Sequence, residues 1–243
     1  MTELSFTWTH DAVPWDSVNK VGTPAALDHL EQGLLDHVWN AAALEDNPLT
    51  PDQVASLFAI PPADPGFDQQ QVLALVAAHH HLAGQVRSGS FRLAKATADR
   101  LHRIVAVHEA IESGHFRGEG SVTGGGHVRL GGRGVYSATS ATDHGAALRA
   151  EFTAGIAALE RLSHPVERAT AYFCLGTRHQ FFFDGNKRTS RIMMNGELMR
   201  CGYDPIIVPV ARRPEFDRHL VTLYREADAT VLMRFLIECA LRG

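Results

Sequence analysis

The sequence lacks three features, and each absence excludes a class of protein. No stretch approaches the roughly 20 consecutive apolar residues of a membrane span, so no membrane partner is expected. Lys and Arg number 23 against 27 Asp and Glu, and this net charge of −4 argues against a basic protein that binds nucleic acid. The first residues contain no charged leader with an apolar stretch behind it, which argues against export.

Cysteine is scarce as well. Cys174, Cys201 and Cys239 are odd in number and far apart, and all three fall within helical patterns. They predict buried thiols in a reducing, cytoplasmic compartment and not a disulfide or zinc framework. Apolar residues make up 45% of the chain and charged residues 21%, which supplies a sizeable core and excludes wholesale disorder.

Apolar residues recur at helical spacing along most of the chain after an irregular segment over residues 1–22. A glycine-rich segment at 114–134 interrupts this pattern, because glycine destabilises helices. Within it, residues 128–130 and 134–136 predict a β-hairpin that turns at 131–132. The fold is therefore predicted to be all-α with one small hairpin. The predicted helices span 24–47, 51–60, 68–86, 93–111, 144–159 (capped by Asp143), 165–178, 186–200, 214–225 and 228–241.

The segment from His179 to Arg191 carries the chemistry. Asp184-Gly185-Asn186 is a turn that leads into a helix, whose first N–H groups and partial positive charge favour a bound phosphate. Gly185 lets the backbone approach a ligand closely, and Asn186 stands where a helix cap is expected. Three cations then share the first turn, where only an anion would neutralise them: Lys187, Arg188 and Arg191. Asp184 before them is placed to hold Mg²⁺, so the segment predicts a nucleotide phosphate site.

These residues resemble the signature of Fic-domain proteins, His-Pro-Phe-x-Asp/Glu-Gly-Asn-Gly-Arg-x-x-Arg. The match is Asp184-Gly-Asn-x-Arg-x-x-Arg191, and Gly114-His-Phe-Arg117 resembles the Gly-x-Tyr/Phe-Arg that leads into the family's target-docking flap. The resemblance covers roughly residues 91–201 and implies a Fic-type helical bundle with a flap at about 120–138. The residues it places in that flap, where a target strand would dock, are Val128, Leu130 and Tyr136.

The resemblance also implies an activity. In the family, the histidine takes a proton from a Ser, Thr or Tyr hydroxyl of a target protein, which attacks the α-phosphate of ATP, and AMP is transferred. Carried over, ATP and Mg are the cofactors, Asp184 binds the metal, and Gly185, Asn186, Lys187, Arg188 and Arg191 bind the nucleotide.

Two positions depart from the signature. The family histidine lies four residues before the acidic residue, where this chain has Gln180, and His179 lies five before. A gapless alignment puts an amide in place of the general base, and an amide is no useful proton acceptor at neutral pH. Alternatively, one bulged residue within 181–183 lets His179 act as the base. The gapless alignment is the favoured one.

The second departure is Lys187, which replaces the usual glycine. Doc toxins of the wider superfamily have lysine there and resemble kinases that transfer the γ-phosphate. Doc-like motifs generally lack the second arginine of the signature, which is present here as Arg191. The sequence therefore combines both patterns. Three hypotheses stay open: AMP transfer, which is favoured, Doc-like phosphate transfer, and a catalytically impaired nucleotide-binding or interaction module.

The sequence also predicts an inhibitory helix within residues 24–47. Many Fic proteins carry a Ser/Thr-x-x-x-Glu-Gly/Asn motif whose glutamate pairs with the second arginine of the signature. Here Glu45 stands at the glutamate position, with alanine and aspartate at the flanking ones. We therefore divide the chain into an N-terminal helical region, 1–90, and a Fic-like core, 91–243, with the signature loop at 179–191. The target protein is not readable from the sequence, and the oligomeric state stays open, a homo-oligomer included.

Overall fold

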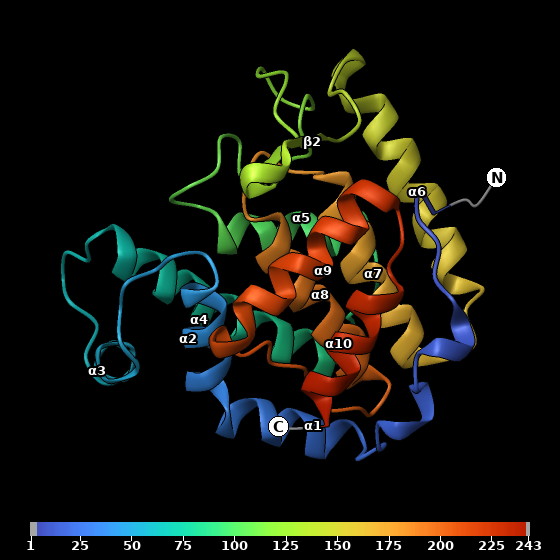
Figure 1. The fold of residues 1–243 in the computed structure, drawn as a ribbon. Helices are drawn as coiled ribbons and strands as arrows, with labels where there is room; N and C mark the ends of the chain where they lie inside the picture. Colours follow the sequence, from blue (N-terminus) through green and yellow to red (C-terminus); the bar gives the residue numbers. More distant parts are fainter. Residues whose placement is uncertain (1–3, 242–243) are drawn as a thin grey trace.

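The computed structural model describes residues 4–241 and confirms the all-α fold with one hairpin (Figure 1). Within these residues no helix combines the length and the apolar character that a membrane crossing needs. The helices, in chain order, are α1 (Thr23–Gln32), α2 (Leu34–Ala43), α3 (Pro51–Ala59), α4 (Phe67–Arg87), α5 (Lys95–Val105), α6 (Ala146–Glu160), α7 (Pro165–His179), α8 (Asn186–Arg200), α9 (Arg213–Glu226) and α10 (Thr230–Ala240).

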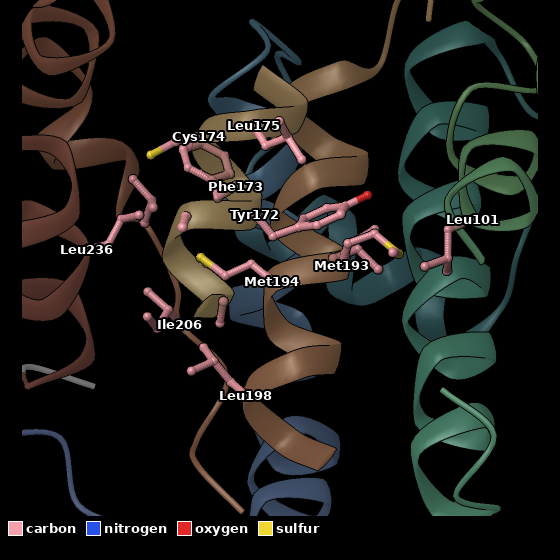
Figure 2. Packing of buried hydrophobic residues seen from close by; sticks show 14 of the residues in the cluster. Leu101, Tyr172, Phe173, Cys174, Leu175, Met193, Met194, Leu198, Ile206 and Leu236 are labelled. Atoms are coloured by element: carbon pink, nitrogen blue, oxygen red, sulfur yellow. The ribbon is translucent and has the colours of Figure 1, made fainter. Parts of the chain in front are cut away.

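The centre of the fold is the pair α7 and α8, joined by residues 180–185 of the signature loop. Every residue from 188 to 199 in α8 is buried, although the helix begins with a strongly polar sequence. Figure 2 shows Phe173, Cys174, Met193 and Met194 from the two helices within one apolar cluster. Burial of so much apolar surface is the main source of stability here, and it holds the polar first turn of α8 rigidly in the interior.

The other helices surround this pair. α1, α4 and α5 pack against α8, whereas α6, α9 and α10 pack against α7 (Figure 1). α2 packs against α4, and Glu45, just after the end of α2, contacts Lys187 and Arg191 in the first two turns of α8. Helices from the N-terminal third of the chain therefore pack against α8 together with α5 and α7.

The predicted hairpin is present as β1 (His127–Arg129) and β2 (Val135–Ser137), which pair antiparallel. Val128 lies opposite Tyr136, and both are half-buried, whereas His127, Arg129, Val135 and Ser137 are exposed. The alternation of a half-buried and an exposed face follows from the two-residue period of a strand.

Three helix boundaries differ from the sequence prediction. The helix expected at 24–47 is broken at Gly33 into α1 and α2, which lets α2 turn toward α8. The helix expected at 93–111 ends at Val105, and turns follow. Asp143 does not cap α6, because His144 adopts a left-handed conformation and Gly145 takes the capping position. The capping box of Thr50 and Gln53 forms as expected.

The N-terminal segment is more ordered than expected, although residues 1–3 of the predicted irregular stretch lie outside the described part. Short 3₁₀ turns form at His10–Ala12 and Trp15–Ser17, and Thr7 makes a bridge to Asp228. Phe6 and Trp15 are buried. The segment is therefore packed onto the helical core and brings its polar side chains next to α7.

Candidate nucleotide site

The signature loop is shaped by two residues in the left-handed backbone region. α7 ends at His179 because Gln180 has φ 48° and ψ 54°, and Gly185 has φ 69° directly before α8. A Cβ on Gly185 would also lie 3.1 Å from the Cβ of Ala106, so both the conformation and the space favour glycine. Gly185 is thus the residue at the cap position of α8, and Asn186, expected there, is the first helical residue.

Asn186 holds the loop closed from inside. Its Oδ1 accepts a hydrogen bond from the Phe182 N–H at 2.9 Å, and its Nδ2 donates to the Phe182 carbonyl at 2.8 Å and to Gln180 Oε1 at 3.2 Å. Phe181 is buried and stacks on Phe116, with ring centroids 4.8 Å apart. The amide group of Asn186 is therefore committed to the shape of the loop.

Arg117 ties the loop to the hairpin segment. Its fully buried guanidinium donates to the carbonyls of Gln180 at 2.6 Å, Gly124 at 2.9 Å and Thr139 at 3.0 Å. A Cβ at Gly126 would lie 2.6 Å from this guanidinium, so the backbone passes directly over it. Arg117 thus satisfies carbonyls at the end of α7 and fixes both ends of the segment that carries β1 and β2.

His102 of α5 supports the other end of the loop. Its Nδ1 accepts a hydrogen bond from the Gly114 N–H at 2.8 Å, so its Nε2 carries the proton and donates to the Asp184 carbonyl at 2.9 Å. Its ring stacks on Phe182 at 3.7 Å. Burial and the nearby Arg188 lower its pKa to about 4, so the ring is neutral at pH 7.

Arg191 faces the end of α2. Its Nη2 lies 3.3 Å from Glu45 Oε1 and 3.3 Å from the Ala41 carbonyl. Its Nε and Nη1 are buried and have no hydrogen-bond partner among residues 4–241. Glu45 also pairs with Lys187 at 3.0 Å. Burial alone would raise the pKa of Glu45, but the cations Lys187, Arg191 and Arg188 outweigh it and hold the pKa below its ordinary value.

The residue after Glu45 has φ 65°, in the region that favours glycine and asparagine. This residue is Asp46, which forms an exposed ion pair with Arg213, with Oδ1 2.5 Å and Oδ2 3.0 Å from the guanidinium. The backbone turn at this point sends the chain away from α2 and leaves the Glu45 carboxylate directed at α8.

Arg188 is paired with Glu109, a residue that the sequence analysis did not single out. Glu109 Oε1 and Oε2 lie 2.5 and 2.8 Å from Nη1 and Nη2, and the Arg188 side chain is 3% exposed. Gln71 donates to Glu109 at 3.1 Å and accepts from Asn47 at 2.7 Å. A buried chain of hydrogen bonds therefore joins Arg188 to Asn47, two residues after Glu45.

Asp184 and Lys187 are the more accessible groups of the site. The Asp184 side chain is 63% exposed, and its Oδ1 accepts from the Gly185 N–H at 2.6 Å. Its other oxygen makes no hydrogen bond to the described residues, so a carboxylate oxygen is available to a cation. Lys187 borders a cleft of about 400 Å³ between the hairpin and α9.

The three hairpin residues expected to dock a target face this cleft or its wall. Val128 and Leu130 line it, and Tyr136 packs against Tyr224 of α9, with ring centroids 4.9 Å apart. The Arg178 guanidinium lies 5.1 Å from the Tyr136 ring. The inward face of the hairpin is therefore in contact with the core, and its exposed face and outer edges are directed to solvent.

His179 and Gln180 point in different directions. Gln180 is held at the loop by Asn186 and also donates to the Thr177 carbonyl at 2.6 Å. His179 turns to α6 and the N-terminal segment, where it contacts Glu151 at 2.7 Å and Ser5 at 2.8 Å. The His179 ring also stacks parallel to that of Phe181, with ring centroids 5.2 Å apart, on the side away from Asn186.

Sequence reasoning missed Glu109, Glu151, Ser5 and the loop-supporting role of His102. Each lies 28 to 174 residues from its partner in the site. Nothing in the local sequence marks these contacts, because each depends on how elements distant in the chain pack together.

Comparisons with known proteins agree with this architecture. A family model described as the Fic/DOC family matches residues 67–198. The curated protein adenylyltransferase Fic of Drosophila virilis is 30% identical over 215 residues, which are 86% of this chain and 41% of that protein. The corresponding protein of Drosophila grimshawi is 30% identical over 215 residues, 86% of this chain and 42% of its own length. The chain thus spans about two fifths of these relatives.

Solved structures have the same fold. A Fic family protein from Desulfovibrio desulfuricans matches with a TM-score of 0.74 at 19% identity, over 98% of this chain and 74% of that one. Fic-1 from C. elegans matches with a TM-score of 0.73 at 21% identity, over 95% and 67%. A Fic domain containing signaling protein from Bacteroides thetaiotaomicron matches with a TM-score of 0.69 at 21% identity, over 94% and 90%.

Proposed function

The chain belongs to the Fic/DOC family, and we propose that it binds ATP with Mg²⁺ at the first turn of α8 and transfers AMP to a hydroxyl side chain of another protein. The relatives named adenylyltransferase support AMP as the transferred group. We further propose that the end of α2 inhibits this activity in the same chain.

The observation that carries the proposal is the state of Arg191. Two nitrogens of its guanidinium, close to the N-terminus of α8, are buried and have no partner among the residues that the structure describes. A buried donor without a partner costs roughly 1–3 kcal/mol, and a phosphate group supplies the acceptors that would remove this cost. Lys187 lies one helical turn before Arg191, and both pair with Glu45. When Glu45 moves away, both cations are free to bind a polyphosphate.

The other residues fit the same ligand. Asp184 offers an exposed carboxylate oxygen for Mg²⁺, which when bound neutralises charge on the phosphates. Gly185 presents its backbone and the first N–H groups of α8. Arg188 keeps its ion pair with Glu109 and adds its positive charge beside the phosphates, one turn from Arg191.

AMP transfer requires that the target hydroxyl attack the α-phosphorus, that pyrophosphate leave, and that the hydroxyl proton be removed. We place Gln180 at the position of the general base, because its side chain contacts the loop amide of Asn186 and that of His179 does not. Loss of a general base lowers a rate by roughly 10²–10⁴-fold. The chain is therefore a slow enzyme or, in the limit, a nucleotide-binding module.

The test uses a Glu45→Gly variant with α-labelled or γ-labelled ATP and a cell lysate. Retention of label on protein from the α position only supports AMP transfer, and retention from the γ position only supports the Doc-like transfer that Lys187 suggests. ATP binding without transfer supports the binding module. Asp46→Gly is the matched control, because the carboxylate of Asp46 lies next to Glu45 in the sequence but pairs with Arg213 and not with α8. If Glu45→Gly binds no ATP, the proposal fails.

A further inference from the structure

We infer that Ser5, His179 and Glu151 form a nucleophilic serine site for acyl transfer, separate from the nucleotide site. Ser5 Oγ lies 2.8 Å from His179 Nε2, and His179 Nδ1 lies 2.7 Å from Glu151 Oε2. The order is nucleophile, base and orienting carboxylate, each within hydrogen-bond distance of the next. Three separate elements supply them: the N-terminal segment, the end of α7, and α6.

The hydrogen bonds determine the tautomer of His179. Burial alone would raise the pKa of Glu151, but hydrogen bonds from His179 and Thr139 and the charge of Arg117 hold it below the ordinary value. An ionised carboxylate only accepts, so His179 Nδ1 carries the proton and donates to Glu151. Nε2 then has its lone pair free and accepts the Ser5 hydroxyl proton. This is the arrangement that a general base needs.

The positions of all three side chains are restrained. The His179 side chain is 8% exposed and its ring is stacked on Phe181, with an interplanar angle of 3°. Thr139 donates to the second oxygen of Glu151 at 2.6 Å. Ser5 itself is exposed, so its hydroxyl is accessible to a small molecule. Arg178 donates to the Ser5 carbonyl at 3.1 Å and places a cation beside the nucleophile.

The reaction follows from these positions. Ser5 Oγ bonds to the carbonyl carbon of an ester while its proton moves to His179 Nε2. The C–O bond to the leaving alcohol breaks, and the alcohol takes that proton from Nε2. Water then hydrolyses the acyl-serine with the same base, and a carboxylic acid is released. A fluorophosphonate reacts in the same way at phosphorus, with fluoride as the leaving group.

The experiment treats the full chain with a fluorophosphonate probe and locates the adduct by peptide mass spectrometry. We expect Ser5 to be labelled at least about 10²-fold faster than Ser90, an exposed serine whose hydroxyl contacts Ser88 and the Gln85 carbonyl but no histidine. Ser5→Ala removes the adduct, and His179→Gln lowers the labelling rate by about 10²-fold or more.

Glu151→Gln is the second variant, because it keeps the volume of the side chain and removes only the charge that orients His179. It is expected to slow labelling by about tenfold or more while the circular dichroism spectrum is unchanged. If Ser5 reacts no faster than Ser90, or if Glu151→Gln and His179→Gln label at the parent rate, the three residues only anchor the N-terminal segment and the inference is overturned. ATP binding at α8 is unaffected by either result.

Discussion

Arg188 and Arg191 lie one turn apart on α8, and both are buried among helices, yet their hydrogen bonds are filled very differently. Arg188 has two short bonds to Glu109, at 2.5 and 2.8 Å. Arg191 has one nitrogen shared between Glu45 and the Ala41 carbonyl, each at 3.3 Å, and two nitrogens without partners among the described residues. The first pair is complete within the chain, whereas the second leaves two buried donors without acceptors among residues 4–241.

This difference distinguishes a structural ion pair from a pair that a ligand can replace. A bidentate arginine–carboxylate pair in the interior is costly to break, since each ion is then left without water or a partner. A long single contact is easily exchanged for phosphate oxygens. The α2 side of α8 is therefore the side we expect to open, and the α5 side is the one that keeps the first turn in place.

A histidine at position 180 allows the opening of the α2 side to be measured as a rate of AMP transfer. We expect Gln180→His in a Glu45→Gly background to raise AMP transfer by about 10²–10⁴-fold over Glu45→Gly alone. Histidine tolerates the left-handed backbone at this position. Label transfer from α-labelled ATP measures the rate, and Gln180→Asn, which tolerates the same backbone but supplies no base, is the control. Equal rates for the histidine and asparagine variants would place the base elsewhere.

Removal of each carboxylate tests the comparison through stability. Glu109→Ala leaves Arg188 buried without its partner and is expected to lower the free energy of unfolding by about 3–5 kcal/mol. Glu45→Ala is expected to cost less, about 1–2 kcal/mol, because its contact with Arg191 is long and Lys187 is more exposed. Urea denaturation followed by circular dichroism measures both. A larger loss in Glu45→Ala would reverse the assignment of the two sides.

Acid is expected to affect the two sides alike. A neutral, buried imidazole lies near each arginine, His102 near Arg188 and His79 near Arg191, and burial lowers both pKa values from 6.5 to about 4. The unfolded chain therefore binds more protons between pH 6.5 and 4, and stability falls as the pH falls through this range. Each imidazole contributes about 3 kcal/mol to the loss.

His102→Gln removes one of these titrations and keeps an acceptor and a donor for Gly114 and Asp184. We expect its unfolding free energy to depend less on pH between 6.5 and 4 than that of the parent. His79→Gln serves as the matched variant on the other side. A parent-like pH dependence in both variants would show that these imidazoles bind protons equally in the folded and unfolded chains, so that burial does not lower their pKa values.

The smallest expected effect is on nucleotide affinity. Glu45→Gly frees Arg191 and Lys187 and is expected to raise ATP affinity by about tenfold, since one charge-assisted contact is worth roughly 1.4 kcal/mol. Glu109→Gln, which keeps one acceptor for Arg188, is expected to change it by at most about threefold. Isothermal titration calorimetry compares both with Asp46→Gly. An increase that is larger in Glu109→Gln would show that Arg188 is the side that opens.

Local patterns in the sequence predicted most of the helices and the position of the hairpin. The helix at 186–200 was predicted with its observed bounds, because turn residues and helix formers follow each other there without conflict. The break at Gly33 was missed, since a single glycine inside an apolar helical pattern does not by itself end a helix. Both α1 and α2 pack against α4, and this tertiary contact is not visible in the sequence pattern.

The contact of Glu45 with Arg191 was expected from the motif alone, whereas the contact of Glu109 with Arg188 was not. Both span long stretches of chain, 146 and 79 residues, so spacing carries no information on either. The inhibitory motif identifies Glu45 as the partner of Arg191, but no motif identifies Glu109 as the partner of Arg188. In the same way, the alignment left His179 and Gln180 as alternatives, and only the directions of their side chains separate them.

The sequence by itself determined the helical fold, the glycine-bounded turn before α8 and the three cations that follow it, because these depend on residues a few positions apart. The tertiary structure decided which carboxylate meets which arginine, and that His179 meets Ser5 and Glu151. Those choices depend on how distant helices pack, and packing depends on the shape of the whole core.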